Sequence, residues 1–345
     1  MKTRYTSPIV LLVVLATTVA HSQTRIDRSS PPRQQFVRGL DGSVQRSIEA
    51  AHESARLPVG PGNENWDAVF ASDGLGLGAW TVSAIVVDGS KIYVGGTFSE
   101  IDGVPANNVA VYDRNSQTWS PIGKGTNGFV SSIVVSGNDV FVGGYFQSAG
   151  DIGADNVARW DGERWNAVGS GMPSQSYVNS LAMYKDRLYV GGHFTLGANA
   201  YDIARLDGST WKSLGASSLN GVWALAVHDD ELLVGGTQIE VGDSVRGPAL
   251  AWNGQRWRSL AGGLDHWNSI AQFASGPSGE LYATGYFEED SLNAIAQWDG
   301  TTWKSLGTGI RRRRFGIQPS MTALAVASNG DLYAGGHFMD SAGAV

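Results

Sequence analysis

The chain has 345 residues, of which 42% are hydrophobic and 17% charged, a composition typical of a globular protein and not of a disordered one. The 25 Lys and Arg against 32 Asp and Glu give a net charge of −7, which argues against nonspecific nucleic-acid binding because that binding needs a cationic surface. The 46 glycines lack a Gly-X-Y period, which excludes collagen, and the absence of cysteine excludes disulfides, thiol catalysis and thiolate metal sites.

Residues 1–22 have the pattern of a secretory signal peptide. Lys2 and Arg4 precede an apolar run over residues 9–16, and small residues follow up to Ala20 or Ser22. The apolar run is too short to span a bilayer, although a short membrane anchor is an alternative interpretation. We therefore expect an exported protein, secreted or held at the cell surface, without a transmembrane span.

Residues 23–60 differ in composition from the rest of the chain. The stretch "SSPPRQQ" is typical of a linker. Val44, Ile48 and Ala51 have helical spacing after a capping candidate at Asp41 or Ser43. This segment predicts a linker with a short helix or a loosely held lead-in, and it offers no chemistry.

Residues 61–345 contain an internal repeat. Five tryptophans recur every 46 residues, at Trp119, Trp165, Trp211, Trp257 and Trp303, and "NENWDAVF" supplies Trp66 in the manner of one more. A second series places a Gly-Gly pair after an aromatic or aliphatic residue and Val or Ala. Its glycines are Gly95 and Gly96, Gly143 and Gly144, Gly191 and Gly192, Gly235 and Gly236, and Gly335 and Gly336.

Each repeat predicts four strands in chain order. The first is an apolar run such as "VSAIVV" at 82, the second is the Gly-Gly strand, the third is of the type "NVARWD", and the fourth begins at the periodic tryptophan. The Asp-Gly pairs at Asp161, Asp207 and Asp299 predict two-residue type I′ turns between the third and fourth strands. Strands that are apolar on both faces favour sheets covered on both sides.

Four-stranded antiparallel units of this length, rich in glycine and with one tryptophan each, predict an all-β fold, a β-propeller. The repeat consensus "LYVGGxF…NxARWDGxxWxxLGxG" resembles that of kelch-type propellers, in particular a class of secreted bacterial repeat proteins. It is more distantly similar to the repeats of fungal cortical cell-polarity markers. We expect about six repeats with the last one incomplete, because the sixth stops at "GGHFMDSAGAV". An incomplete sixth repeat interrupts the ring of blades near the point where its two ends meet. If the ring closes, we expect the protein to be a monomer.

The repeated motifs have structural interpretations. A catalytic site is not normally copied five times, so the tryptophans are expected to pack between blades, with a multivalent lectin as the alternative. The Gly-Gly pairs lack the spacing of a phosphate-binding loop and indicate close backbone approach. The acidic clusters 229–231 and 288–290 match no calcium loop and are expected to be solvated turns, with weak calcium binding as a minor alternative. No metal site and no cofactor are predicted.

Binding is predicted at one end of the blades. The connections between the second and third strands and between the fourth and first are long and varied, and they open on the same face, where recognition usually occurs on a rigid scaffold. The arginine run at 311–314 is expected in an extended loop, either solvated or contacting an anionic partner. The predicted binding residues are Tyr145, Phe146, His193, Phe194, His266, Trp267, Arg311, Arg312, Arg313 and Arg314.

The sequence favours a noncatalytic extracellular or cell-surface scaffold that binds proteins. A carbohydrate-binding propeller is the first alternative, and a polysaccharide-active enzyme the second. The chain has neither the cysteine of copper-radical oxidases nor a G-x-S-x-G elbow, so no catalytic residue is predicted. The expected partner is a protein or glycan at the cell surface and not nucleic acid.

Overall fold

The computed structural model describes residues 36–38, 44–46, 81–173, 175–197, 200–218, 221–242, 244–264, 268–287, 295–306, 320–326 and 330–337. The chain divides into two units, one of residues 18–75 and one of residues 1–17 and 76–345. Within the described ranges, no helix is long and apolar enough to cross a membrane. The predicted signal peptide and Trp66 lie outside these ranges.

The unit of residues 18–75 contains one small antiparallel hairpin. Its strands are β1 (Phe36–Arg38) and β2 (Val44–Arg46), with Arg38 opposite Val44. The expected helix that includes Val44 is therefore not formed at this residue, because Val44 pairs across the hairpin. The rest of the predicted linker lies outside the described residues.

The other unit consists of repeated antiparallel sheets. Three of them have the strand order β3 (Thr81–Asp88), β4 (Lys91–Thr97), β7 (Val109–Asp113), β8 (Thr118–Pro121); then β9 (Phe129–Ser136), β10 (Asp139–Tyr145), β13 (Val157–Trp160), β14 (Trp165–Ala167); then β15 (Tyr177–Tyr184), β16 (Arg187–Gly197), β17 (Ala200–Asp207), β18 (Thr210–Ser213). We call these blades one, two and three. Each pairs first strand to second, second to third and third to fourth, as the repeat predicts.

Two further blades follow the same order. They comprise β20 (Val222–His228), β21 (Glu231–Val241), β22 (Val245–Trp252), β23 (Trp257–Ser259); and β24 (Ser269–Ser275), β25 (Leu281–Tyr286), β26 (Ile295–Trp298), β27 (Trp303–Ser305). A pairing of Thr237 with Ser269 joins blades four and five into one nine-stranded sheet, which also contains β19 (Ala216–Ser218). Two strands of a sixth blade follow, β28 (Ser320–Val326) and β29 (Leu332–His337).

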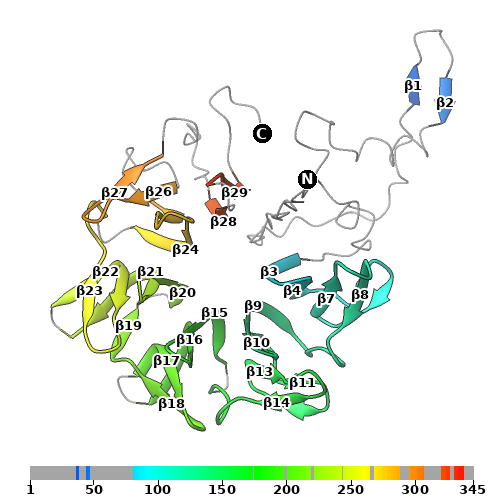
Figure 1. Cartoon of the computed structure of the whole chain (residues 1–345), viewed down its shortest axis with the longest axis horizontal. Helices are drawn as coiled ribbons and strands as arrows, with labels where there is room; N and C mark the ends of the chain where they lie inside the picture. The colour runs from blue at the N-terminus through cyan, green and yellow to red at the C-terminus, as the bar shows by residue number, and fades with distance from the viewer. Residues whose placement is uncertain are drawn as a thin grey trace, which may run out of the picture. The chain divides into compact units, whose positions relative to one another are not determined.

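The first strands of successive blades contact one another, from β3 to β9, β15, β20, β24 and β28. Figure 1 shows these strands on the inner side of the blades, which follow one another along an arc within this unit. This is the arrangement of a β-propeller, and it confirms the predicted all-β fold class. In blades one and two, the long connections between second and third strands carry small hairpins of their own, β5 (Glu100–Ile101) with β6 (Val104–Pro105) and β11 (Ser148–Ala149) with β12 (Ile152–Gly153).

The two glycines of a pair face different neighbours. A Cβ on Gly143 would lie 2.7 Å from Val178 Cγ1 in the first strand of the next blade. A Cβ on Gly144 would instead overlap the carbonyl oxygen of Phe129 in the first strand of its own blade. The pairs at Gly95, Gly191 and Gly235 repeat this division, and Gly335 and Gly336 lie in β29. Both positions need glycine, because the first glycine packs against the next blade and the second packs against the backbone of its own blade.

The periodic tryptophans lie at the starts of the fourth strands and are mostly buried. Trp119, Trp165, Trp211 and Trp303 are between 3% and 8% exposed, and Trp257 is partly buried. Trp165 Nε1 donates to the carbonyl of Ile122 in the preceding blade, 3.1 Å away. Trp257 and Trp303 donate in the same way to carbonyls 43 residues earlier. Buried rings cannot be sugar platforms, so the multivalent lectin alternative does not hold for Trp119, Trp165, Trp211 and Trp303.

The Asp-Gly pairs do not form type I′ turns. Trp160 pairs with Trp165 across a four-residue loop, and Asp161 Oδ1 accepts the N–H groups of Glu163 and Arg164. These two N–H donors hold the pKa of the Asp161 carboxyl down at about 2. In the other hairpin, between first and second strands, Lys185 and Asp186 both have positive φ, 49° and 57°, as a type I′ turn requires.

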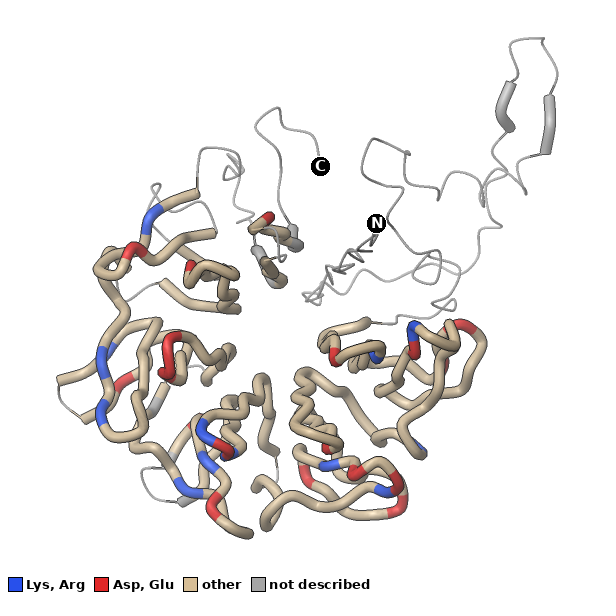
Figure 2. The backbone as a smooth tube through the Cα atoms, viewed as in Figure 1, with Lys and Arg blue, Asp and Glu red and all other residues tan. Residues whose placement is uncertain are grey.

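The acidic cluster at 229–231 is a solvated turn, as expected. Asp229 and Asp230 have φ of 48° and 56° and connect β20 to β21. Asp230 forms an ion pair with Lys185 of the preceding blade at 3.0 Å, and Glu231 forms one with Arg258. Figure 2 shows charges of both signs on each of blades one to five. The cluster 288–290 lies outside the described residues.

Candidate functional site

The long connections meet at one end of the blades, which we call the loop face. In blade one, the connection from the fourth strand to the next blade hydrogen-bonds back to the connection between second and third strands, with Thr126 N donating to Asn107 O. The same segment continues to blade two, where Asn127 N donates to Ser148 O and Thr126 pairs with Ala149. The predicted clustering of these connections is therefore present between blades one and two.

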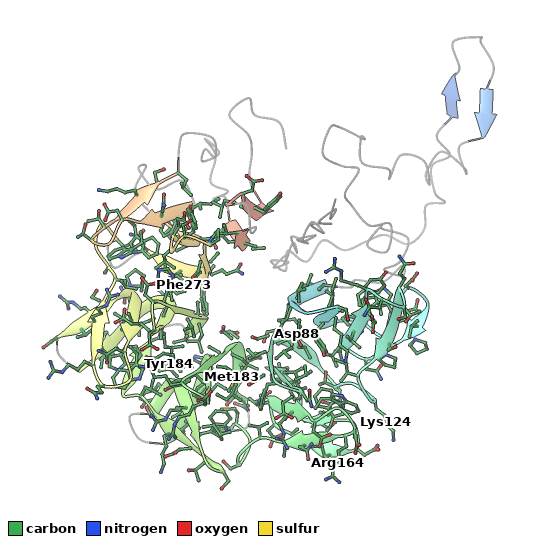
Figure 3. The ribbon with its side chains drawn as sticks, viewed as in Figure 1. Asp88, Lys124, Arg164, Met183, Tyr184 and Phe273 are labelled. Carbon is green, nitrogen blue, oxygen red and sulfur yellow. The ribbon has the colours of Figure 1, made fainter. Side chains whose placement is uncertain are left out.

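A polar groove of about 460 Å³ lies at this junction. It is lined by residues 97–99, 107–108 and 124–127, with Ser148 and Gly150. Lys124, labelled in Figure 3, is 71% exposed and forms an ion pair with Asp151 at 2.7 Å. Because the pair is exposed to solvent, it contributes little to stability. The remaining lining presents hydroxyl, amide and backbone groups, which suit a ligand with many hydrogen-bonding groups.

A repeated side-chain cap shapes the loop face. Asn108 and Asn156 have φ of 64° and 65°, and their Oδ1 atoms accept the N–H groups of Phe98 and Phe146 at 3.1 Å. Asp202 has φ of 60° and accepts the N–H of Phe194 at 3.2 Å. The cap turns the residue after each Gly-Gly-X back into the blade. Its sequence signal is the Asn or Asp directly before the Val-Ala or Ile-Ala of the third strand, which the sequence analysis did not single out.

The cap corrects two of the predicted binding residues. Phe146 and Phe194 are only 3% and 4% exposed and belong to the cores of blades two and three. Their rings support the loop face from below and are not available to a ligand. Tyr145 and His193, which precede them, remain on the surface.

Three exposed side chains form what we call the aromatic row: Tyr145, Tyr177 and His193. The rings of Tyr145 and Tyr177 stack with centroids 4.6 Å apart and an interplanar angle of 14°, and they are 46% and 47% exposed. They join blade two to blade three. Tyr177 pairs across the strands with His193, so both side chains lie on the same face of blade three. The sequence analysis missed Tyr177 because it begins a strand that reads as an apolar run.

His193 lies beside a buried carboxylate. Its Nδ1 is 3.6 Å from Asp202 Oδ1, and the His193 side chain is 65% exposed whereas that of Asp202 is 5% exposed. Burial raises the pKa of the Asp202 carboxyl, while the N–H of Phe194, His193 and the N–H of Ser218 act to lower it. Within the described ranges, no three His, Asp or Glu side chains are grouped to hold a metal ion.

The other predicted binding residues cannot be placed. His266, Trp267 and Arg311–Arg314 lie outside the described residues. His266 and Trp267 follow shortly after Leu264, which lines a second cavity of about 470 Å³ together with the paired residues Glu240 and Arg246.

Comparisons with known proteins agree on the fold. Residues 90–116 match a family described as a β-propeller domain of unknown function (DUF5122). No curated protein matches. A chain of the mitotic checkpoint complex is 18% identical with a TM-score of 0.50, and the match covers 76% of this chain and 75% of that one.

Two other solved structures are extracellular domains from B. thetaiotaomicron. That of the putative hybrid two-component system BT3049 is 12% identical with a TM-score of 0.51, and the match covers 78% of this chain and 34% of that one. That of the putative one-component system BT4673 is 15% identical with a TM-score of 0.49, covering 75% and 32%. The present chain therefore spans about a third of these two chains, and the likeness to the BT3049 domain, at 12% identity, shows the fold alone.

Proposed function

We propose that this protein is a noncatalytic, extracellular β-propeller that binds a partner through its loop face. The observation that carries the proposal is the stacked, half-exposed pair Tyr145 and Tyr177. Large aromatic side chains with a polar tip are enriched where proteins bind other molecules, because one ring contributes contact area and its hydroxyl a hydrogen bond. The export signal in residues 1–22 supports an extracellular location.

Comparison between blades supports a binding role for the pair. At the junction of blades one and two, the same two places are occupied by Thr97 and Phe129. That junction forms with a threonine and a phenylalanine, so the fold itself does not require two tyrosines. Their presence at one junction is therefore better explained by a partner than by stability.

Replacing both Tyr145 and Tyr177 by threonine is expected to abolish loop-face binding and to leave the fold intact. The measurement is retention of the labelled, intact protein on extracellular material from the organism that produces it. We expect at least a tenfold loss of retention for the double variant and an unchanged melting temperature within a few degrees.

The matched control is Tyr333→Thr, since Tyr333 is 39% exposed but lies at the start of β29, near the opposite end of the blade. This variant should bind like the original protein. Equal retention of all three proteins would contradict the proposed function.

A further inference from the structure

The aromatic row is interrupted at the junction of blades three and four. Tyr177, which begins the first strand of blade three, covers Tyr145 of blade two. The residue at the same place in blade four is Gly221, directly before β20, and it lies against His193 of blade three. A Cβ on Gly221 would be 2.8 Å from the carbonyl oxygen of Gly192 and 3.4 Å from the Cβ of His193, so the backbones of blades three and four approach closely there.

Among the residues that the structure describes, Gly221 places no side chain over the imidazole of His193. It has no side chain, and its φ of 89° disfavours any residue that has one. The His193 side chain is 65% exposed. The imidazole of His193 is therefore open beside Tyr177. A ring of a bound ligand can lie on this imidazole, in the place that a side chain from blade four would otherwise occupy.

The surroundings of this opening indicate the charge of the ligand. His193 already has the Asp202 carboxylate 3.6 Å from its Nδ1, and Lys124 of the polar groove is paired with Asp151. No described cation of the groove or the row is left for an acidic ligand. An anionic group would lie near Asp202, and a cationic group would compete with His193 for the same carboxylate.

The polar groove and the aromatic row are parts of one surface. The chain runs from Tyr145 in the row to Ser148 and Gly150 in the groove. The Asn127 side chain fixes this segment by accepting the N–H groups of Gln147 and Ser148 at 2.8 Å and 2.9 Å. A ligand that spans both parts meets flat aromatic rings at one end and amides and hydroxyls at the other.

We propose that this surface binds an uncharged glycan, with a sugar ring lying on His193 beside Tyr177 in the place left by Gly221. A pyranose has an apolar face of C–H groups, which packs on aromatic rings, and a rim of hydroxyls, which matches the groove. The inference rests on the proposed function, and it adds the class of ligand and the place of one sugar ring.

The test is an array of oligosaccharides probed with the intact protein. The array holds neutral glucans, mannans, galactans and xylans beside uronic-acid and sulfated counterparts, and the affinity for the strongest hit is then measured in solution. We expect binding to a neutral glycan, and at least a tenfold loss of affinity in His193→Thr and in Tyr177→Thr. Threonine is chosen because blade one carries Thr97 and Thr81 at these positions.

The controls separate this inference from the proposed function. Tyr333→Thr should keep the original affinity, and circular dichroism should show that the variants are folded. Binding confined to acidic glycans, or neutral-glycan binding unaffected by His193→Thr, would overturn the inference. So would retention on extracellular material that protease removes and periodate does not, although that result would leave loop-face binding standing. Absence of any retention that depends on the loop face would instead refute the proposed function itself.

Discussion

Replacing Trp165 by alanine is expected to lower the free energy of unfolding by about 3–5 kcal/mol, the usual cost of removing a large buried aromatic side chain. Trp165 is 6% exposed, packs against Trp160 with ring centroids 5.5 Å apart, and donates to the carbonyl of Ile122 in the preceding blade. The substitution removes contacts within blade two and a hydrogen bond between blades. Chemical denaturation of the purified protein measures the loss.

Two further variants identify the source of the effect. Trp165→Phe keeps most of the ring but leaves Ile122 O without its indole donor, so we expect an intermediate loss of about 1–3 kcal/mol. Tyr333→Thr changes an exposed ring and should lie within about 0.5 kcal/mol of the original protein. If Trp165→Ala were as stable as Tyr333→Thr, the tryptophans would not join the blades.

Replacing Gly144 by alanine is expected to cost about 3 kcal/mol, at the upper end of the range for overpacking. The added Cβ would overlap the carbonyl oxygen of Phe129 and lie 3.0 Å from the Cα of Val130. Both obstacles are backbone atoms of the neighbouring strand, so no side chain can move away to make room. The melting temperature and the denaturant midpoint both report the change.

Gly153→Ala is the matched control in the same blade. Gly153 lies in β12, and a Cβ built on it meets no atom within 4 Å. Its stability should stay within about 0.5 kcal/mol of the original protein. A similar loss for both glycine variants would mean that the Gly-Gly pair is not required by close approach of the strands.

The fold was predictable because its signal is repeated. The 46-residue spacing of Trp119, Trp165, Trp211, Trp257 and Trp303 fixes the length of the repeat, and a Gly-Gly pair marks the second strand in every blade except the fifth, which has Thr284 and Gly285. Where the strand pattern of one repeat is ambiguous, the same positions in the other repeats resolve it. The turn after Trp160 was predicted less well, because an Asp-Gly pair serves several turn types and here the Asp161 side chain caps a four-residue loop.

The candidate site was predictable only in part. Tyr145 and His193 were found because they occupy a variable position that follows a recurrent pair of glycines. Phe146 was misassigned because its direction depends on the cap from Asn156, ten residues later. Tyr177 and Gly221 were missed, since their role depends on the residue that each meets in the preceding blade, 32 and 28 residues earlier. Single-sequence patterns do not show such contacts between neighbouring repeats.

The central claim is that the partner binds at the loop face, and hydrogen exchange of the intact protein with and without its bound partner tests it most directly. We predict slower exchange in peptides that cover residues 97–108, 122–128 and 145–150, which form the groove and reach the aromatic row. The hairpin turns at Lys185–Asp186 and Asp229–Asp230, at the other end of the blades, should exchange at unchanged rates. Protection confined to those turns, with the loop-face peptides unaffected, would contradict the account.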